Sequence, residues 1–243
     1  MDAALDDNVI PECQPTAAPK ALWAMFVSPL ATLDRLRQRP RSLLPLFVAA
    51  LYATGVNYYM VNRIGLARLV TVAAKSAATI DPDAMVQNAL AHQAQMIAFQ
   101  SIFCFLGVFA QVLFVALVLW LLVLLAGGDS KFRNVLAVAA HVTFFTTIVK
   151  YSMLAISLTL NNDPDTFNPI NPLATNLGFF FHASSRAASH LLSTVDLITL
   201  ATLFLLVAGL TKVCDRLSRT AASLVVLVPW GIYVAGSAWF LPS

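Results

Sequence analysis

The sequence predicts an all-α membrane protein, a polytopic bundle of five transmembrane helices preceded by a short amphipathic helix at the membrane surface. Of the 243 residues, 59% are hydrophobic and only 11% are charged, whereas soluble domains are about a quarter charged. The mean hydropathy is +0.76. Five apolar stretches each supply the roughly 20 residues that a helix needs to cross a bilayer core of about 30 Å. These features exclude an ordinary soluble protein and a disordered one.

Residues 1–20 form a separate segment, a flexible acidic tail on the cytoplasmic side. The segment contains three prolines and four carboxylates: Asp2, Asp6, Asp7 and Glu12. Such a composition buries little apolar surface and is typical of disorder. A secretory signal begins instead with basic residues and continues with an apolar stretch. A single membrane domain is expected to follow over residues 21–241.

Apolar residues recur at intervals of three and four positions at the start of this domain, as they do on one face of a helix. They are Leu22, Trp23, Phe26, Val27, Leu30, Leu33 and Leu36. A basic cluster lies at the far end: Arg35, Arg37, Arg39 and Arg41. The pattern predicts an interfacial helix whose arginines face lipid phosphates, at about 1 kcal/mol per cation. Because Pro29 interrupts it, one helix and two short helices fit equally well.

The five spans are expected at residues 43–61, 95–126, 137–160, 191–211 and 221–241. In lipid each backbone must satisfy its own hydrogen bonds, which requires helices. The second stretch is long, so it is expected to tilt or to project beyond the lipid. Gly209 in the fourth span is expected to allow a close approach between helices. The glycine pair Gly127-Gly128 is typical of a tight turn between two spans.

The cations are distributed unevenly between the two sides of this bundle. With the N-terminus in the cytoplasm, four of the 15 lie outside and Lys150 lies within the membrane. The other ten lie inside: Lys20, Arg35, Arg37, Arg39, Arg41, Lys131, Arg133, Lys212, Arg216 and Arg219. Because loops on the cytoplasmic side carry the excess of Lys and Arg, the N-terminus is predicted to be cytoplasmic and the C-terminus outside.

Two ionisable residues fall inside predicted spans, Lys150 in the third and Asp196 in the fourth. A charge in the bilayer interior costs at least about 2.5 kcal/mol, so it is expected to have a partner or a function. At a rise of 1.5 Å per residue, both lie about 8 to 15 Å below the outer surface. They can form a structural ion pair, or they can carry a proton or a substrate. Lys150 can also extend its amine toward the surface.

The sequence contains no catalytic signature, because HExxH, GxSxG, P-loop and GxGxxG patterns do not occur in it. Its three cysteines have no CxxC spacing, which argues against a zinc site or a disulfide framework. His141 is typical of a packing residue. A four-residue spacing places His182, Arg186 and His190 on one helical face, which can be exposed to solvent or can bind lipid phosphates. We expect no enzyme activity, no cofactor, no metal and, at a net charge of +3, no nucleic-acid binding.

Three stretches, in their order along the chain, resemble the bacterial branch of the Yip1 family of membrane proteins. The first runs from Phe26-Val27-Ser28-Pro29 through Arg39-Pro40 to Leu44-Pro45-Leu46. The second, residues 127–136, is a glycine pair followed by a basic, aromatic turn. The third, residues 192–200, carries Asp196 near the start of the fourth span and is followed by Gly209 and Leu210. The likeness covers about residues 22–241.

The resemblance implies a five-span protein of the bacterial inner membrane, without known catalysis. Eukaryotic relatives act with Rab-type GTPases in vesicle traffic, but the short N-terminal tail gives no basis for transferring that partnership. The chain also departs from the family pattern. Ile198 and Ala201 stand where relatives often have phenylalanine and tryptophan, a proline common in the third span is missing, and Lys150 is not a family feature.

Two functions from different classes fit these features. The first is a non-enzymatic scaffold or membrane-organising protein that acts through helix packing and its basic cytoplasmic rim. Its partners would be membrane lipids, other membrane proteins or further copies of the chain. The second is a small transporter or lipid-translocating protein with a polar crevice around Lys150 and Asp196. In the second, Asp196→Asn would abolish flux and leave a folded protein.

Overall fold

The computed structural model describes residues 18–77, 81–161, 175, 192 and 194–239. Helices make up nearly all of these residues and no strand occurs among them. The helices are α1 (Ala18–Val27), α2 (Pro29–Arg35), α3 (Leu43–Ile64), α4 (Leu66–Ala77), α5 (Pro82–Ala91), α6 (Gln93–Leu125), α7 (Phe132–Leu160), α10 (Leu197–Val213) and α11 (Arg219–Trp239).

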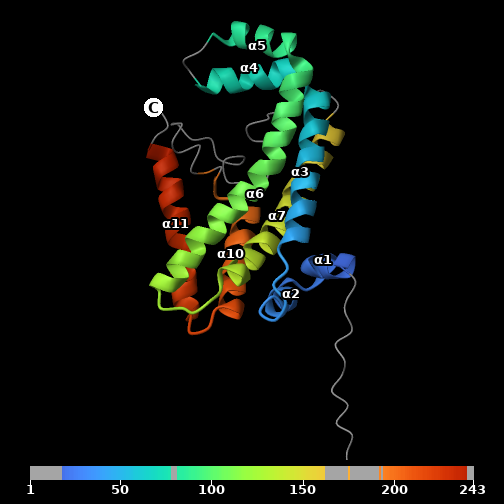
Figure 1. The fold of residues 1–243 in the computed structure, drawn as a ribbon. Coiled ribbons are helices and arrows are strands. Elements are labelled where there is room, and N and C mark those ends of the chain that lie inside the picture. The colour runs from blue at the N-terminus through green and yellow to red at the C-terminus, as the bar shows by residue number, and fades with distance from the viewer. Residues whose placement is uncertain (1–17, 78–80, 162–174, 176–191, 193, 240–243) are drawn as a thin grey trace, which may run out of the picture.

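Five of these helices form an up-and-down bundle in which α3, α6, α7, α10 and α11 alternate in direction (Figure 1). Four of them, α3, α6, α7 and α11, are long and apolar enough to cross a membrane, and α10 is a shorter apolar helix of 17 residues. The start of α3 and the end of α11 lie at opposite ends of the bundle. The predicted polytopic helical bundle is therefore confirmed.

The fourth helix of the bundle differs most from its expected span. The span was expected over residues 191–211, whereas α10 begins at Leu197 and ends at Val213. Asp196 sets this start, because its carboxylate accepts a hydrogen bond of 2.6 Å from the backbone N–H of Thr199 and so caps the first turn. A capping carboxylate in place of a helical residue explains the later start.

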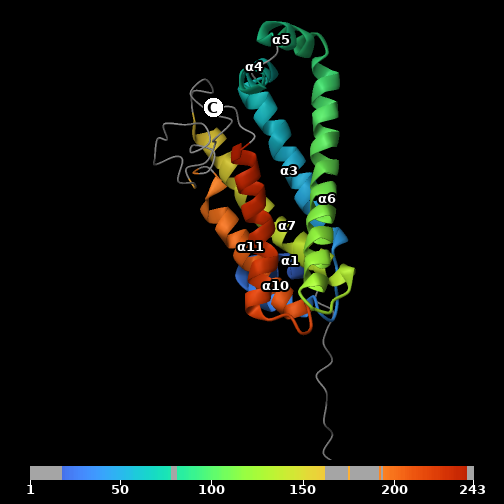
Figure 2. The same cartoon turned by 90° about the vertical axis from the view of Figure 1, so that its left-hand side faces the viewer.

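The segment between the first two expected spans, residues 62–94, contains two helices that the hydropathy pattern does not predict. α4 and α5 lie across the upper end of the bundle (Figures 1 and 2). Gly65, with φ +91°, turns the chain from α3 into α4. Asp81 caps α5 through the N–H groups of Asp83 and Ala84, and Pro82 is its first residue. Nearly all of residues 161–190, between the third and fourth expected spans, lies outside the described residues, including His182, Arg186 and His190.

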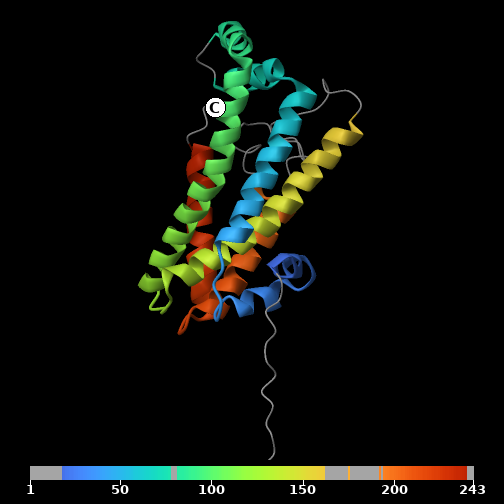
Figure 3. The same ribbon diagram turned by 45° about the vertical axis from the view of Figure 1, so that its right-hand side comes forward.

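The amphipathic segment forms two helices with a break at Ser28, which decides between the alternatives that Pro29 left open. These helices do not simply lie on a membrane surface, because they pack against the lower end of the bundle (Figure 3). The ring of Phe26 lies 5.6 Å from that of Phe144 in α7, and Leu33 is fully buried. The apolar residues of this segment lie on more than one face of its helices, and some of them contact the bundle and not lipid.

Three other apolar residues of this segment face outward. Trp23 is 68%, Val27 73% and Leu30 45% exposed. The two helices, which we call the α1–α2 elbow, therefore have one apolar face packed on the bundle and another that no described residue covers.

The largest core cluster lies where the elbow meets α7, α10 and α11, and includes the fully buried Met25, Leu33 and Leu210. Gly209 is its closest packing point. A Cβ added at Gly209 would lie 2.5 Å from Cγ1 of Val138 in α7 and 3.5 Å from Cδ2 of Leu33. The prediction that Gly209 permits close helix packing is confirmed.

Candidate functional site

Most cations of the chain gather at the lower end of the bundle, which we call the basic end. It consists of the elbow, the 36–42 linker, the 126–131 loop and the 214–218 loop, with the helix ends that these join. Ten of the 15 Lys and Arg residues belong to it: Lys20, Arg35, Arg37, Arg39, Arg41, Lys131, Arg133, Lys212, Arg216 and Arg219. At the opposite end the described cations are Arg63, Arg68 and Lys75.

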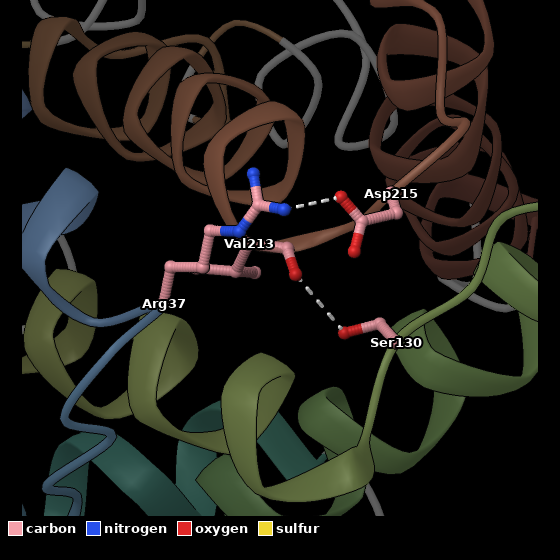
Figure 4. A network of polar contacts seen from close by, with 4 residues as sticks. All are labelled: Arg37, Ser130, Val213 and Asp215. Atoms are coloured by element: carbon pink, nitrogen blue, oxygen red, sulfur yellow. Dashed lines mark hydrogen bonds and ion pairs between the residues drawn. The ribbon is translucent and has the colours of Figure 1, made fainter.

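The two loops of the basic end are joined through their backbones. Asp129 N–H donates to the carbonyl of Asp215 at 3.0 Å, and Asp215 N–H donates to that of Asp129 at 2.9 Å. Ser130 Oγ also donates to the carbonyl of Val213 at 3.5 Å (Figure 4). Gly127 has φ +76°, as the expected tight turn between α6 and α7 requires. These hydrogen bonds hold the 126–131 loop and the 214–218 loop in a fixed position relative to each other.

Two ion pairs join residues 34–37, at the end of α2 and the start of the linker, to residues 212–215, at the end of α10 and the start of the loop that follows. Arg37 Nη2 lies 2.7 Å from Asp215 Oδ1 (Figure 4), and Lys212 Nζ lies 3.3 Å from Asp34 Oδ1. Each segment supplies one cation and one anion. Because all four side chains are exposed, each pair contributes at most about 1 kcal/mol to stability. Arg37 nevertheless has a protein partner, unlike its neighbours in the predicted cluster.

The side chains of Arg35, Arg39 and Arg41 are exposed, and within the described ranges none of them makes a hydrogen bond or an ion pair. Arg133 stands beside them, because its Nε donates to the carbonyl of Pro40 at 3.3 Å. Guanidinium groups with free N–H donors bind phosphate oxygens, often in a bidentate manner. The arrangement is chemically suited to anions such as phospholipid headgroups.

Burial changes the chemistry of Cys214, which follows α10 at this end. Burial raises the pKa of the Cys214 thiol above its ordinary value, a hydrogen bond with Ser130 lowers it, and the charge of Asp215 raises it. Burial is the largest of these effects. The thiol therefore stays protonated near neutral pH and is a poor nucleophile.

The structure does not bring Lys150 and Asp196 into an ion pair. The Gly209 and Val138 contact sets the register of the antiparallel helices α10 and α7. Lys150 lies 12 residues beyond Val138 (138 to 150), and Asp196 lies 13 residues before Gly209 (209 to 196), so both stand at nearly the same level.

The Asp196 carboxylate has partners within the first turn of α10. Oδ1 accepts from Thr199 N at 2.6 Å and Oδ2 accepts from Thr199 Oγ1 at 2.8 Å. Lys150 is exposed on α7 and has no ion pair with any described residue. Asp196 thus acts as a helix cap, which needs no lysine.

Substitutions at these two positions distinguish a cap from a charge pair. Asp196→Ala is expected to lower the free energy of unfolding by about 1 kcal/mol, and Asp196→Asn by much less, because asparagine is also a good cap. In a double-mutant cycle with Lys150→Met, denaturant titration in detergent micelles should give a coupling energy near zero. A coupling energy above about 1 kcal/mol would show that the two charges interact.

His141 is buried in α7, and its Nδ1 donates to the carbonyl of Ala137 at 2.9 Å, as expected of a packing histidine. No group of three or more His, Cys, Asp or Glu side chains among the described residues could hold a metal ion.

Sequence reasoning missed a polar cluster between α3, α6 and α7. Asn57 Nδ2 donates to Cys104 Sγ at 3.2 Å and to Tyr151 OH at 3.4 Å, and Tyr52 and Ser152 share a hydrogen bond of 2.7 Å. Tyr151 of α7 belongs to this interhelical cluster. Only the presence of an asparagine in an apolar span signals the cluster in the sequence.

Comparison with protein families gives one match. The family model described as Yip1 domain matches residues 23–240, a stretch that runs from within α1 to the end of α11 and includes every cation of the basic end except Lys20. No match is found among curated proteins or among solved structures.

Proposed function

Because the chain belongs to the Yip1 domain family of membrane proteins, we propose that it is a non-enzymatic membrane-organising protein that collects anionic lipids at its basic end. The multi-pass helical bundle fixes this end at one surface of the membrane. Members of the family are generally not enzymes, which supports a role without catalysis.

The observation that carries the proposal is the set of exposed guanidinium groups at Arg35, Arg39 and Arg41, which have no partner among the described residues. Each basic side chain near an anionic membrane surface contributes about 1 kcal/mol of attraction. The outward-facing Trp23 and Val27 of the elbow lie just before these arginines in the chain. Tryptophan favours the headgroup level of a bilayer, so the elbow combines both elements of a lipid-binding surface.

In this proposal the basic end faces the cytoplasm, in the bacterial inner membrane. Ten of the chain's cations at one end against three described at the other support that orientation through the positive-inside rule. The anionic lipids of the cytoplasmic leaflet then lie at the arginines. The N-terminus is cytoplasmic and the C-terminus lies outside.

The scaffold role extends to partners within the membrane. The exposed apolar sides of α6 and α11 can contact other membrane proteins or further copies of the chain. A transport role lacks comparable support, because the Asp196 carboxylate is engaged by Thr199 and has no ion pair with Lys150.

Lipid analysis of membrane patches tests the proposal. The protein is extracted with its surrounding lipids in polymer nanodiscs, and the lipid composition is compared with that of the whole membrane. We expect anionic phospholipid to be enriched several-fold around the wild type. The variant Arg35→Gln/Arg39→Gln/Arg41→Gln should lose the enrichment, because it loses about 3 kcal/mol of attraction.

A matched control removes three cations from the opposite end of the bundle, in the variant Arg63→Gln/Arg68→Gln/Lys75→Gln. This variant should keep the enrichment. Wild-type patches with the composition of the bulk membrane, or an equal loss in the control, would contradict the proposal. Thermal melting of all three proteins shows whether each is folded.

A further inference from the structure

We propose that the basic end contains a defined site for one anionic phospholipid, with its phosphate at Arg39, Arg41 and Arg133 and one acyl chain in a groove along α3. The inference rests on the proposed function and deepens it, since it names where a lipid is held and by which groups.

The phosphate part of the site is built around Pro40. Arg39 and Arg41 flank this residue in the linker before α3, and both side chains are exposed. Arg133, at the start of α7, is tied to the same point by the 3.3 Å bond from its Nε to the Pro40 carbonyl. Within the described ranges its two terminal nitrogens make no hydrogen bond. A guanidinium held by Nε presents its remaining N–H donors to a phosphate in fixed geometry.

The chain part of the site is an apolar groove of about 370 Å³ on α3, lined by Val48, Leu51, Tyr52, Gly55 and Val56. Gly55 creates the hollow, because nothing lies within 4 Å of a Cβ added there. The hydroxyl of Tyr52 is not left without a hydrogen-bond partner in the groove, since it shares a 2.7 Å hydrogen bond with Ser152 of α7. The groove therefore offers almost entirely carbon surface, which suits a hydrocarbon chain.

The two parts have the spacing of a lipid molecule. At a rise of 1.5 Å per residue, Val48 lies about 10 Å and Gly55 about 20 Å from Arg41 along the chain direction. One leaflet of a bilayer core is about 15 Å thick. Leu44 lies one turn before Val48 on the same side of α3 and is 42% exposed, so it continues the apolar surface toward the arginines. A chain descending from a phosphate at Pro40 would thus reach the groove.

The positive charge of the arginines near the groove favours a lipid as its occupant over a second copy of the protein. A second copy related by symmetry would bring its own arginines against Arg39 and Arg41, and like charges that face each other oppose association. An anionic phospholipid supplies the opposite charge. The groove and the arginines are complementary to a single lipid molecule.

Native mass spectrometry of the full-length protein in detergent, with phosphatidylglycerol as the probe, tests the site. We expect one tightly held lipid per chain, bound more strongly than phosphatidylcholine. Arg39→Gln/Arg41→Gln should weaken binding about tenfold or more, because two cations near the phosphate are lost. Gly55→Leu should weaken it about fivefold, because the new side chain fills the groove and removes packing contacts with the lipid chain.

The control for Gly55→Leu is Gly107→Leu on α6. Gly107 is also exposed, and a Cβ added there also meets nothing within 4 Å. This variant should bind the lipid as the wild type does. Glycerol phosphate, which has the phosphate without the chains, should not compete.

Three results would overturn the site. If Gly55→Leu binds normally while the arginine variant does not, lipid is held by charge alone and the proposed function still stands. If glycerol phosphate competes as well as phosphatidylglycerol, the site holds only phosphate. If the wild type is a dimer that Gly55→Leu dissociates, the groove is a contact between copies. Failure of the proposed function is seen separately, as bulk lipid composition in the nanodiscs.

Discussion

Gly209→Leu is expected to lower the free energy of unfolding by about 3 kcal/mol, because the first added carbon already has no space. That carbon would lie 2.5 Å from Cγ1 of Val138 and 3.5 Å from Cδ2 of Leu33. Both neighbours are fully buried, so neither can turn away into solvent or lipid. The substitution has to separate α10 from α7 or displace the elbow. Denaturant titration in detergent micelles measures the loss.

Two further comparisons show that the loss comes from overpacking at this contact. Gly107→Leu adds the same side chain at an open position and should leave stability nearly unchanged. In the pair Gly209→Ala and Gly209→Ala/Val138→Ala, removal of the two Val138 methyl groups should restore part of what the first change costs. Wild-type stability for Gly209→Leu would mean that the two helices do not approach as closely as described.

Leu33→Ala is expected to cost about 2 to 5 kcal/mol, the range for a leucine removed from a packed core. Leu33 has no exposed surface and lies in the main core cluster, next to Gly209. The Leu33 side chain therefore packs α2 against the bundle and holds it there. The cavity left by the substitution should loosen the elbow as well as lower the melting temperature.

The same helix provides the control, since Leu30 is 45% exposed. Leu30→Ala should cost less than about 1 kcal/mol, and hydrogen exchange in residues 22–36 should increase only for Leu33→Ala. Equal effects of the two substitutions would support the simpler arrangement that the sequence alone predicts, with the whole segment lying on the membrane surface.

The bundle could be predicted from the sequence because many residues contribute to each span and errors at single positions cancel. The ends of the elements depend on single side chains, and there the prediction failed. The depth of Asp196 in the membrane indicates a charge partner, whereas the backbone N–H of Thr199 three residues later makes Asp196 a helix cap. The sequence Asp81-Pro82 is a helix-start signal that indicates α5, but hydropathy alone does not show a helix between the first two spans.

The basic end was only partly visible in the sequence. The charge pattern showed the arginine cluster, but it could not show that Arg37 binds Asp215, which is 178 residues away, or that Arg133 reaches Pro40. Such contacts depend on how the helices pack. The groove at Gly55 has no sequence signal either, because a glycine in a span indicates close helix packing as readily as an open hollow.

Accessibility of single cysteines in intact cells tests whether the basic end faces the cytoplasm. Cys13, Cys104 and Cys214 are replaced by serine, and one cysteine is introduced at Gln38 in the linker or at Gln87 in α5, both of which are exposed. We predict that a membrane-impermeant maleimide labels Gln87→Cys in intact cells and Gln38→Cys only after the cells are opened. Labelling of Gln38→Cys but not Gln87→Cys in intact cells would place the arginines on the outer surface and contradict the proposed lipid-organising role.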